Sequence, residues 1–147
     1  MIIELSKNAK RCIRRAKDIA VSLGHSSLDS GHLLLGILTD AATKAYIVME
    51  SIGIQRYDVE KELKSLRPPI GQLIEEPEIS EDLKNAIEIA SDILKRTNEQ
   101  EISPELLIVS TLLRGNSPSN KIIKNMEYDP GLIIREMGIP LGENPVF

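Results

Sequence analysis

The sequence predicts an all-α fold of eight helices, in which two pseudo-symmetric repeats of four helices each pack into a single domain, 1–147. When the sequence is shifted against itself by 74 residues, apolar positions coincide from Leu5 to Met137 without a gap. Solenoid repeats usually run about 20–50 residues and need more than two copies, so a duplicated domain explains this period better. Apolar residues recur at helical spacing, and no segment alternates apolar and polar residues over the length of a strand. Ile13 coincides with Ile87, and we expect the two to occupy equivalent core sites.

Size and composition suit one ordinary globular domain. The 147 residues are 41% hydrophobic and 27% charged, which is enough to form one core. No run of about 20 apolar residues is present to span a bilayer, and the amino terminus lacks the apolar stretch of a signal peptide. We therefore expect a soluble protein with a cytoplasmic localisation. The single cysteine, Cys12, excludes an internal disulfide and is expected to be a small buried residue.

The first repeat covers about residues 5–66. Its first helix carries apolar residues at helical spacing up to Leu23, and Gly24 follows where a C-terminal cap is expected. Ser30 can cap a second helix, which is apolar on most sides and therefore belongs in the middle of the fold. The second, third and fourth helices are expected at about 30–39, 43–52 and 56–66.

A linker at 67–78, rich in proline, glycine and acidic residues, separates the repeats. The second repeat, about 79–138, begins with a helix that Ser80 caps and that has acidic residues in its first turn. Residues 139–147 follow it as a tail. Each of its other helices starts with a serine or aspartate followed by proline, which is a pattern typical of helix starts. These pairs are Ser103-Pro104, Ser117-Pro118 and Asp129-Pro130.

The net charge of −4 conceals an uneven distribution, with 11 basic and 8 acidic residues in 1–74 but 7 basic and 14 acidic residues in 75–147. This balance argues against non-specific binding of nucleic acid, which needs clustered lysine and arginine, and no membrane partner is expected. Basic residues nevertheless crowd the outer side of the first helix, as either a docking face for acidic partners or a solvated face. A solvated face is favoured because only Lys84 keeps the charge in the second repeat. The basic residues are Lys7, Lys10, Arg11, Arg14, Arg15 and Lys17.

Residue patterns for catalysis are missing from the sequence. It contains no GxxxxGK[ST] phosphate loop, GxSxG nucleophile elbow, HExxH zinc motif or GxGxxG loop. With only two histidines, His25 and His32, and one cysteine, a zinc site would need carboxylates to complete it. We therefore expect neither an enzyme nor a bound cofactor or metal. His32 is expected to pack or hydrogen-bond in the core, with His25 in the loop before it.

Segment 24–38, GHSSLDSGHLLLGIL, resembles the GHxxIGTEHLLLGLL signature of the amino-terminal repeat domain of Clp ATPases (the Clp N domain, ClpA/ClpC type). Clp ATPases are AAA+ unfoldases that feed the Clp peptidase. The preceding residues, LSKNAKRCIRRAKDIAVSLG, are similar to the FTxRAxxVLxxAxxxAxxLG helix of the same repeat. A looser second copy lies at 79–94 and 102–113, so the resemblance spans about 4–138 and indicates a divergent copy of the domain.

The resemblance implies a helical module without catalytic activity, which recognises substrate or adaptor proteins and hands them to an ATPase ring for ATP-dependent proteolysis or chaperone action. Its partners would be substrates or adaptor proteins and a Clp ATPase or peptidase assembly. A second interpretation keeps the fold and changes the role. In that case, the chain is a free-standing accessory protein that docks on and modulates a Clp assembly without binding substrate.

In Clp proteins of the Gram-positive type, each repeat carries a pocket for phosphorylated arginine, built around the cap of the first helix and the glutamate of GTEH. A capping hydroxyl and helix amides suit a phosphate, and a carboxylate suits a guanidinium. Carried over to this sequence, the resemblance implies Ser80, Glu105 and Ser6 as candidate ligand-binding residues, whereas Gly31 replaces the glutamate of the first repeat. Asp29 either supplies a displaced carboxylate or caps its helix. Glu105 is also explained as an acidic first-turn residue favoured by the helix dipole.

Overall fold

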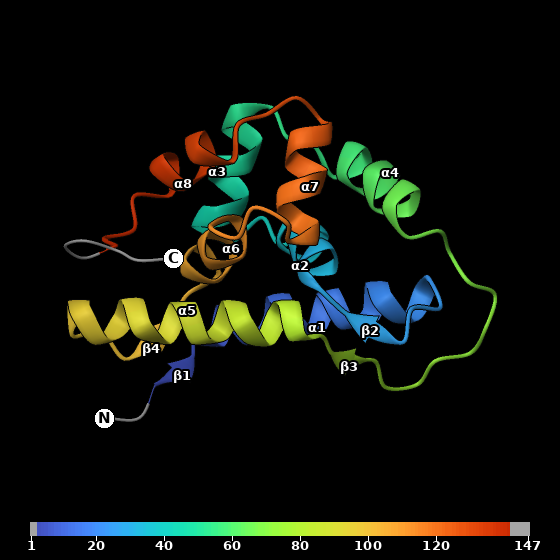
Figure 1. Ribbon diagram of the computed structural model, residues 1–147, viewed down its shortest axis with the longest axis horizontal. Coiled ribbons are helices and arrows are strands. Elements are labelled where there is room, and N and C mark those ends of the chain that lie inside the picture. The colour runs from blue at the N-terminus through green and yellow to red at the C-terminus, as the bar shows by residue number, and fades with distance from the viewer. Residues whose placement is uncertain (1–2, 142–147) are drawn as a thin grey trace.

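The computed structural model describes residues 3–141, within which the chain forms eight helices and four short strands (Figure 1). Residues 1–2 and 142–147, which include most of the expected tail, lie outside the described residues. The helices of the first repeat are α1 (Lys7–Ser22), α2 (Ser30–Ile37), α3 (Lys44–Ile52) and α4 (Arg56–Leu66). Those of the second repeat are α5 (Glu81–Thr97), α6 (Pro104–Leu112), α7 (Pro118–Asn125) and α8 (Pro130–Met137).

The element boundaries confirm the duplication. Every helix of the second repeat begins 74 residues after its counterpart in the first, as α5 does relative to α1. Except at α4, where Gln55 makes no side-chain cap, a capping side chain fixes each start by accepting a hydrogen bond from a backbone amide of the first helical turn. At α2 the cap is Asp29 rather than Ser30, one residue earlier than expected. The caps predicted for the second repeat are all present, at Ser80, Ser103, Ser117 and Asp129.

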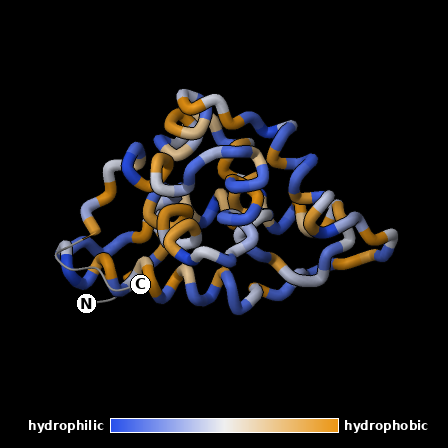
Figure 2. The backbone as a smooth tube through the Cα atoms, turned by 45° about the horizontal axis from the view of Figure 1, so that its top comes forward, coloured by the Kyte–Doolittle hydropathy of each residue, from blue (hydrophilic) through white to orange (hydrophobic). Residues whose placement is uncertain are grey.

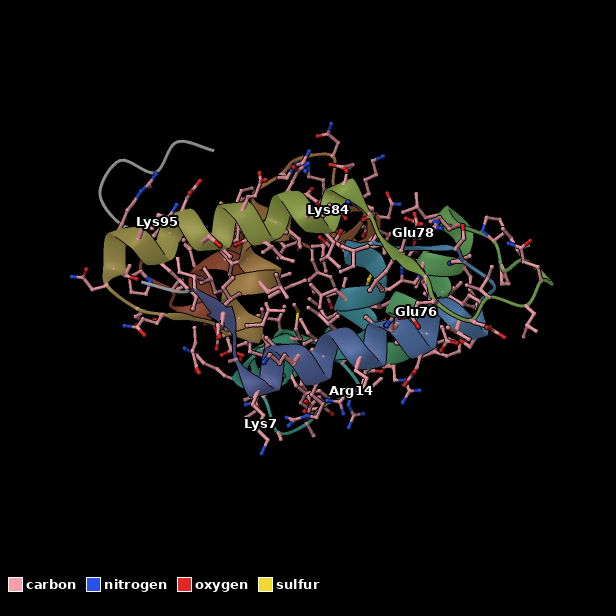
Figure 3. The ribbon with its side chains drawn as sticks, turned by 90° about the horizontal axis from the view of Figure 1, so that it is seen from below. Lys7, Arg14, Glu76, Glu78, Lys84 and Lys95 are labelled. Atoms are coloured by element: carbon pink, nitrogen blue, oxygen red, sulfur yellow. The ribbon has the colours of Figure 1, made fainter. Side chains whose placement is uncertain are left out.

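Three layers of helices surround a shared core. The long helices α1 and α5 form one face, α2 and α6 lie in the middle, and the four remaining helices cover the other face (Figure 1). Seen from below, α1 and α5 run antiparallel (Figure 3). All eight residues of α2 and eight of the nine in α6 are buried, as expected for helices that are apolar on most sides.

Short strands join the two repeats crosswise, a feature absent from the sequence prediction. Two residues are too few to show the alternation that identifies a strand. The first strand of the chain pairs in parallel with the fourth, and the second pairs in parallel with the third. These strands are β1 (Glu4–Leu5), β2 (Ser27–Leu28), β3 (Glu78–Ile79) and β4 (Glu101–Ile102).

The strand pairs determine which helix starts are neighbours. The Ser6 amide donates to the Ile102 carbonyl at 2.9 Å, which continues the β1–β4 pairing to the start of α1. The Ser80 amide donates to the Leu28 carbonyl at 2.9 Å and does the same for β3 and β2. The start of α1 therefore lies beside the start of α6, and the start of α5 lies beside that of α2.

Small side chains on the inner side of α1 let α2 pack closely against it. Ala9, Cys12, Ala16 and Ala20 are buried there. Gly36 of α2 is so close to α1 that an added Cβ would lie 2.9 Å from the Cys12 carbonyl oxygen. The expectation that Cys12 is a small buried residue is thus confirmed, and burial is the main cause that raises the pKa of its thiol to about 11.

Ile13 and Ile87, predicted as equivalent core residues, are equivalent but only half-buried. They lie at the edge of the apolar stripe of each helix, whereas Leu83 in α5 is fully buried. In Figure 2, hydrophobic and hydrophilic residues alternate along the long helices, as expected for amphipathic helices with one side facing solvent. The two sites are therefore equivalent, as predicted, but their side chains are less buried than predicted.

Candidate functional site

The three sequence-predicted site residues lie at two separate places in the fold. Ser6 follows β1, and Glu105 lies in the first turn of the helix that follows β4, so the β1–β4 pair brings them to the same end of the molecule. Ser80 follows β3 and lies next to β2 and the start of α2, where Gly31 replaces the family glutamate. The structure therefore groups Ser6 with Glu105, and Ser80 with Gly31.

Ser6 and Ser80 both act as helix caps. The Ser6 hydroxyl oxygen accepts from the Ala9 amide at 3.0 Å, and that of Ser80 accepts from the Leu83 amide at 3.2 Å. Both serines are half-buried. A hydroxyl that accepts one hydrogen bond still has a proton to donate, so either serine can also offer a donor to an anion placed at its helix start.

Glu105 contacts the other repeat. Its Oε2 atom accepts a hydrogen bond from the Ala45 amide, 3.0 Å away at the start of α3. A carboxylate at a helix N-terminus satisfies an amide that lacks a partner within the helix and interacts favourably with the helix dipole. The half-buried carboxylate therefore has a structural role at this position, in addition to any role in ligand binding.

Because Gly31 has no side chain, the end of the fold beside Ser80 lacks a glutamate. Neighbouring atoms already occupy the space that a side chain at this position would need. A Cβ added to Gly31 would lie 2.9 Å from Leu63 Cδ1. Asp29 does not supply a displaced carboxylate, because both of its oxygens are engaged. Its Oδ1 accepts from the Gly31 amide at 2.8 Å, and its Oδ2 accepts from Arg67 Nη1 at 2.5 Å. Of the two roles considered for Asp29, capping is therefore the one that the structure supports.

Two further cross-repeat caps surround this end. The Asp82 carboxylate accepts from the Ser30 amide at 2.8 Å, and the Ser30 hydroxyl accepts from the Ser119 amide, at the start of α7, at 2.9 Å. Ser119 is the counterpart of Ala45, so Ser30 caps α7 as Glu105 caps α3. A short hydroxyl thus replaces a carboxylate in the same structural task.

Both histidines form one buried relay, and sequence analysis predicted only part of it. The Asp29 amide donates to His32 Nδ1 at 3.0 Å, so the proton of His32 is on Nε2, which faces His25 Nδ1 at 2.9 Å. His25 Nε2 in turn donates to the Pro68 carbonyl at 3.1 Å, at the beginning of the linker. His32 is in the core, as expected, and His25 is as buried as its partner although it lies in the loop. Burial is the main cause that lowers the pKa of His32, to about 4.

The basic side of α1 is partly neutralised within the chain. Arg11 Nε lies 2.7 Å from Asp40 Oδ2, and Arg15 Nη1 donates to the Thr39 carbonyl at 3.0 Å. Burial acts to raise the pKa of Asp40, but the hydrogen bonds from Arg11 and the Ala42 amide, together with the charges of Arg11 and Arg15, hold that pKa below its ordinary value. Figure 3 shows Lys7 and Arg14 projecting from α1 on the side away from α5.

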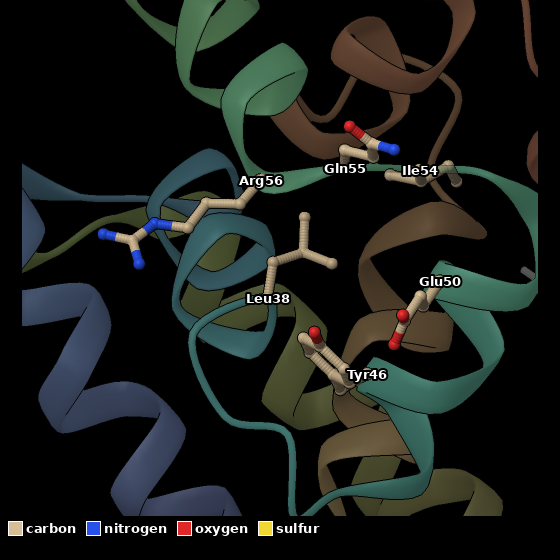
Figure 4. A pocket seen from close by; sticks show the side chains of 6 residues that line it. All are labelled: Leu38, Tyr46, Glu50, Ile54, Gln55 and Arg56. Carbon is tan, nitrogen blue, oxygen red and sulfur yellow. The ribbon is translucent and has the colours of Figure 1, made fainter.

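A hollow of about 210 Å³ lies between the end of α2, α3 and the start of α4. Figure 4 shows Tyr46 and Glu50 of α3 facing Leu38, while the Arg56 side chain extends away from them. A phenol, a carboxylate and an aliphatic surface can hold a small side chain with one polar group. Sequence reasoning missed this hollow because its walls come from three helices that meet only in the folded chain. Its lining residues are Leu38, Tyr46, Glu50, Ile54, Gln55 and Arg56.

Two kinds of feature are absent from the part of the chain that the structure describes. Residues 3–141 contain no group of three or more histidine, cysteine, aspartate or glutamate side chains that could hold a metal ion. Within the same residues, no helix has both the length and the apolar character needed to cross a membrane.

Comparison with known proteins agrees with the geometry. Residues 4–126 match the family described as Clp repeat (R) N-terminal domain. The chain is 27% identical over 141 residues to a "Probable ATP-dependent Clp protease ATP-binding subunit" of Chlamydia pneumoniae, covering 93% of this chain and 16% of that protein. It is 19% identical over 126 residues to the "Negative regulator of genetic competence ClpC/MecB" of Bacillus subtilis, covering 86% of this chain and 16% of that protein. The chain thus spans about a sixth of the length of these relatives.

Solved structures share the fold. The N-terminal domain of the Caseinolytic protease associated chaperone ClpD from Arabidopsis thaliana superposes with a TM-score of 0.76 at 18% identity, covering 90% of this chain and 91% of that one. The Hsp104 N-terminal domain from Candida albicans gives a TM-score of 0.74 at 15% identity, with 91% and 89% covered. At such low identity the likeness establishes the arrangement of helices.

Proposed function

This chain belongs to the family of Clp repeat N-terminal domains, and from that membership we propose that it is a non-catalytic module that binds other proteins for a Clp unfoldase or protease assembly. The observation that carries the proposal is the family match over residues 4–126 of a duplicated helical fold. The relatives named as ATP-binding subunits of Clp protease give the kind of assembly in which it would act.

The partners are substrate proteins or an adaptor, and the helix starts offer the first surface to test. Ser6 and Glu105 lie at the starts of α1 and α6, which the β1–β4 pair brings to the same end of the fold, and this end offers helix amides, a hydroxyl and a carboxylate. A phosphorylated arginine, if it is the recognised group, binds at this end, with its phosphate at the start of α1 and its guanidinium near Glu105. Ser80 lies at the other end, beside Gly31, and has no glutamate at that position to pair with a guanidinium.

Two observations favour the alternative, an accessory protein that docks on a Clp assembly without binding substrates. Glu105 already accepts the Ala45 amide, and Gly31 has no side chain to offer. A ligand guanidinium would share the Glu105 carboxylate with α3. An accessory protein would bind the assembled machine and would bind no isolated peptide or unfolded protein.

The test is a titration of the ¹⁵N-labelled 147-residue chain with phosphoarginine, with arginine and phosphoserine as controls, followed by reduced and carboxymethylated α-lactalbumin as an unfolded protein. Saturable shifts with the unfolded protein support a substrate-binding module. Shifts near Ser6 and Glu105 with phosphoarginine alone identify the recognised group. If neither probe causes shifts at millimolar concentration, the chain does not bind substrates, and the role of an accessory protein is favoured instead.

A further inference from the structure

Each repeat has a surface where its first helix meets the loop between its second and third helices. In the first repeat, the chain's own side chains close this surface. Arg11 Nε lies 2.7 Å from Asp40 Oδ2, and Arg15 Nη1 donates to the Thr39 carbonyl at 3.0 Å. An ion pair and a charged hydrogen bond therefore bridge α1 and the loop between α2 and α3.

The equivalent surface of the second repeat is open. Asn85 and Arg114 take the positions of Arg11 and Asp40, and an amide cannot neutralise a guanidinium. A hollow of about 520 Å³ lies between α5 and the loop that joins α6 to α7. We call it the α5 hollow, and it is lined by Asn85, Glu88, Ile89 and residues 113–116.

The positive charge of Arg114 has no partner in the described part of the chain. The residue is half-buried, and its Nη1 atom is buried without a hydrogen-bond acceptor. Among residues 3–141, the Arg114 guanidinium forms no ion pair, although Glu88 lines the same hollow. An enclosed donor on a charged group is costly to leave unpaired, so a ligand oxygen that reaches it binds favourably.

Apolar surface lies next to this cation. Ile89 and Leu113 both line the α5 hollow and pack at the edge of the core. In the first repeat, the same positions hold Arg15 and Thr39, which hydrogen-bond to each other. The second repeat thus combines an unpaired guanidinium with two aliphatic side chains at the place where the first repeat bonds to itself.

We propose that the α5 hollow is a docking site for an acidic segment of a partner protein, in which an aspartate or glutamate side chain pairs with Arg114 and an adjacent apolar side chain packs on Ile89 and Leu113. The planar guanidinium matches a carboxylate in a two-bond geometry, and its half-buried setting strengthens the attraction relative to that of a fully exposed pair. Glu88 repels runs of acidic residues, so a single acid beside an apolar residue fits best. The inference rests on the proposed function and adds the surface and the chemistry of the partner.

The probe is the blocked peptide acetyl-Gly-Glu-Leu-Gly-amide, titrated into the ¹⁵N-labelled 147-residue chain. Its matched control replaces the glutamate by glutamine, which keeps the shape and removes the charge. We expect saturable shifts at Asn85, Ile89 and 113–116, and roughly ten- to hundredfold weaker binding of the glutamine peptide. Equal affinities, or shifts confined to other surfaces, overturn the proposal. Tighter binding of acetyl-Gly-Leu with a free carboxyl end overturns the assignment to an acidic side chain.

Variants separate the guanidinium from the general charge of the domain. Arg114→Gln is expected to weaken the glutamate peptide at least tenfold, and Glu88→Gln to strengthen its binding, because a like charge is removed. Lys124→Gln makes the same charge change as Arg114→Gln on exposed α7 surface and is expected to leave the affinity within twofold. A loss of affinity with Lys124→Gln that equals the loss with Arg114→Gln contradicts a specific site.

A double variant tests the comparison between the repeats. Asn85→Arg combined with Arg114→Asp recreates the ion pair of the first repeat and is expected to close the α5 hollow. The chain should keep a folded spectrum and lose peptide binding. A folded double variant that still binds the glutamate peptide overturns the proposal.

Carboxymethylated α-lactalbumin distinguishes this inference from the proposed function. A chain that binds the unfolded protein but not the glutamate peptide disproves the docking site and leaves the proposed function standing. Binding of the peptide without binding of the unfolded protein supports the docking site and indicates an adaptor as the partner. If the chain binds neither of these and also shows no shifts with phosphoarginine, both are wrong.

Discussion

The Glu105 carboxylate accepts the Ala45 amide at 3.0 Å and so joins the first turn of α6, in the second repeat, to the start of α3, in the first. The counterpart bond runs in the opposite direction between the repeats, from the Ser119 amide to the Ser30 hydroxyl at 2.9 Å. Each repeat thus caps the third helix of the other. The two caps differ in charge, and only the carboxylate can also pair with a cationic ligand.

Replacing Glu105 by glutamine or alanine tests this cap. Glu105→Gln keeps an acceptor and loses the charge, so we expect a loss of about 0.5–1 kcal/mol in the free energy of unfolding. Glu105→Ala leaves the Ala45 amide without its partner and should cost about 1–2 kcal/mol. Urea unfolding followed by circular dichroism measures both values. Glu136→Gln, on the exposed side of α8, is the matched control and should change stability by less than about 0.5 kcal/mol. A loss for Glu105→Ala no larger than that of the control would show that the cap is not needed.

Gly24 is expected to be far less tolerant of alanine than Gly71 in the adjoining linker. Gly24 has φ of +70°, and an added Cβ would lie 1.8 Å from the Ile70 carbonyl oxygen. The Ile70 amide donates to the Leu23 carbonyl at 2.8 Å, so the linker cannot move away without losing that bond. Gly24→Ala should therefore cost about 2–4 kcal/mol in urea unfolding. Gly71 has no atom within 4 Å of an added Cβ, so Gly71→Ala should be nearly neutral, and equal losses at both sites would contradict the close packing.

Sequence alone could predict the helices because their starts are local signals. Asp129 followed by Pro130 marks the start of α8 whatever lies around it, and the same is true of Ser80 at α5. The pairing of site residues is not local. Two-residue strands decide that Ser6, rather than Ser80, shares an end with Glu105, and these strands are too short to show a pattern. The α5 hollow could not be predicted for a similar reason. It forms between α5 and the loop that joins α6 to α7, and these segments meet only in the folded chain.

The partial burial of Ile13 and Ile87 leads to a prediction about stability. Ile13 and Ile87 are half-buried, so replacement by alanine opens only a partial cavity and should cost about 1–2 kcal/mol at each site. Leu83, fully buried on the same helix as Ile87, should cost about 2–5 kcal/mol on the same change. Urea unfolding of the three variants measures the order. A loss at Ile87 that matches the loss at Leu83 would indicate that Ile87 lies deeper than the structure places it.

The histidine relay predicts that acid destabilises the fold well before most carboxylates are protonated. Protonated His32 would carry a hydrogen on Nδ1, directed at the Asp29 amide that now donates to that atom. Besides burial, the charges facing His32 are those of Asp29, which favours protonation, and of Arg67 and His25, which oppose it. His32 is therefore neutral in the folded chain, where its pKa is about 4, against 6.5 for a free histidine.

Because the folded pKa is lower than the unfolded one, the unfolded chain binds more protons between these values, and the free energy of unfolding falls as pH decreases. The contribution of His32 is fully present above about pH 6.5 and is lost progressively towards pH 4, by up to about 3 kcal/mol. The lowered pKa of Asp40 acts in the same direction at lower pH, below the ordinary carboxyl value of 3.8. Urea unfolding at pH 7, 6, 5 and 4.5 measures the slope. In His32→Gln, which does not titrate, the slope between pH 6.5 and 4.5 should largely vanish, and an unchanged slope in that variant would assign the acid sensitivity to other groups.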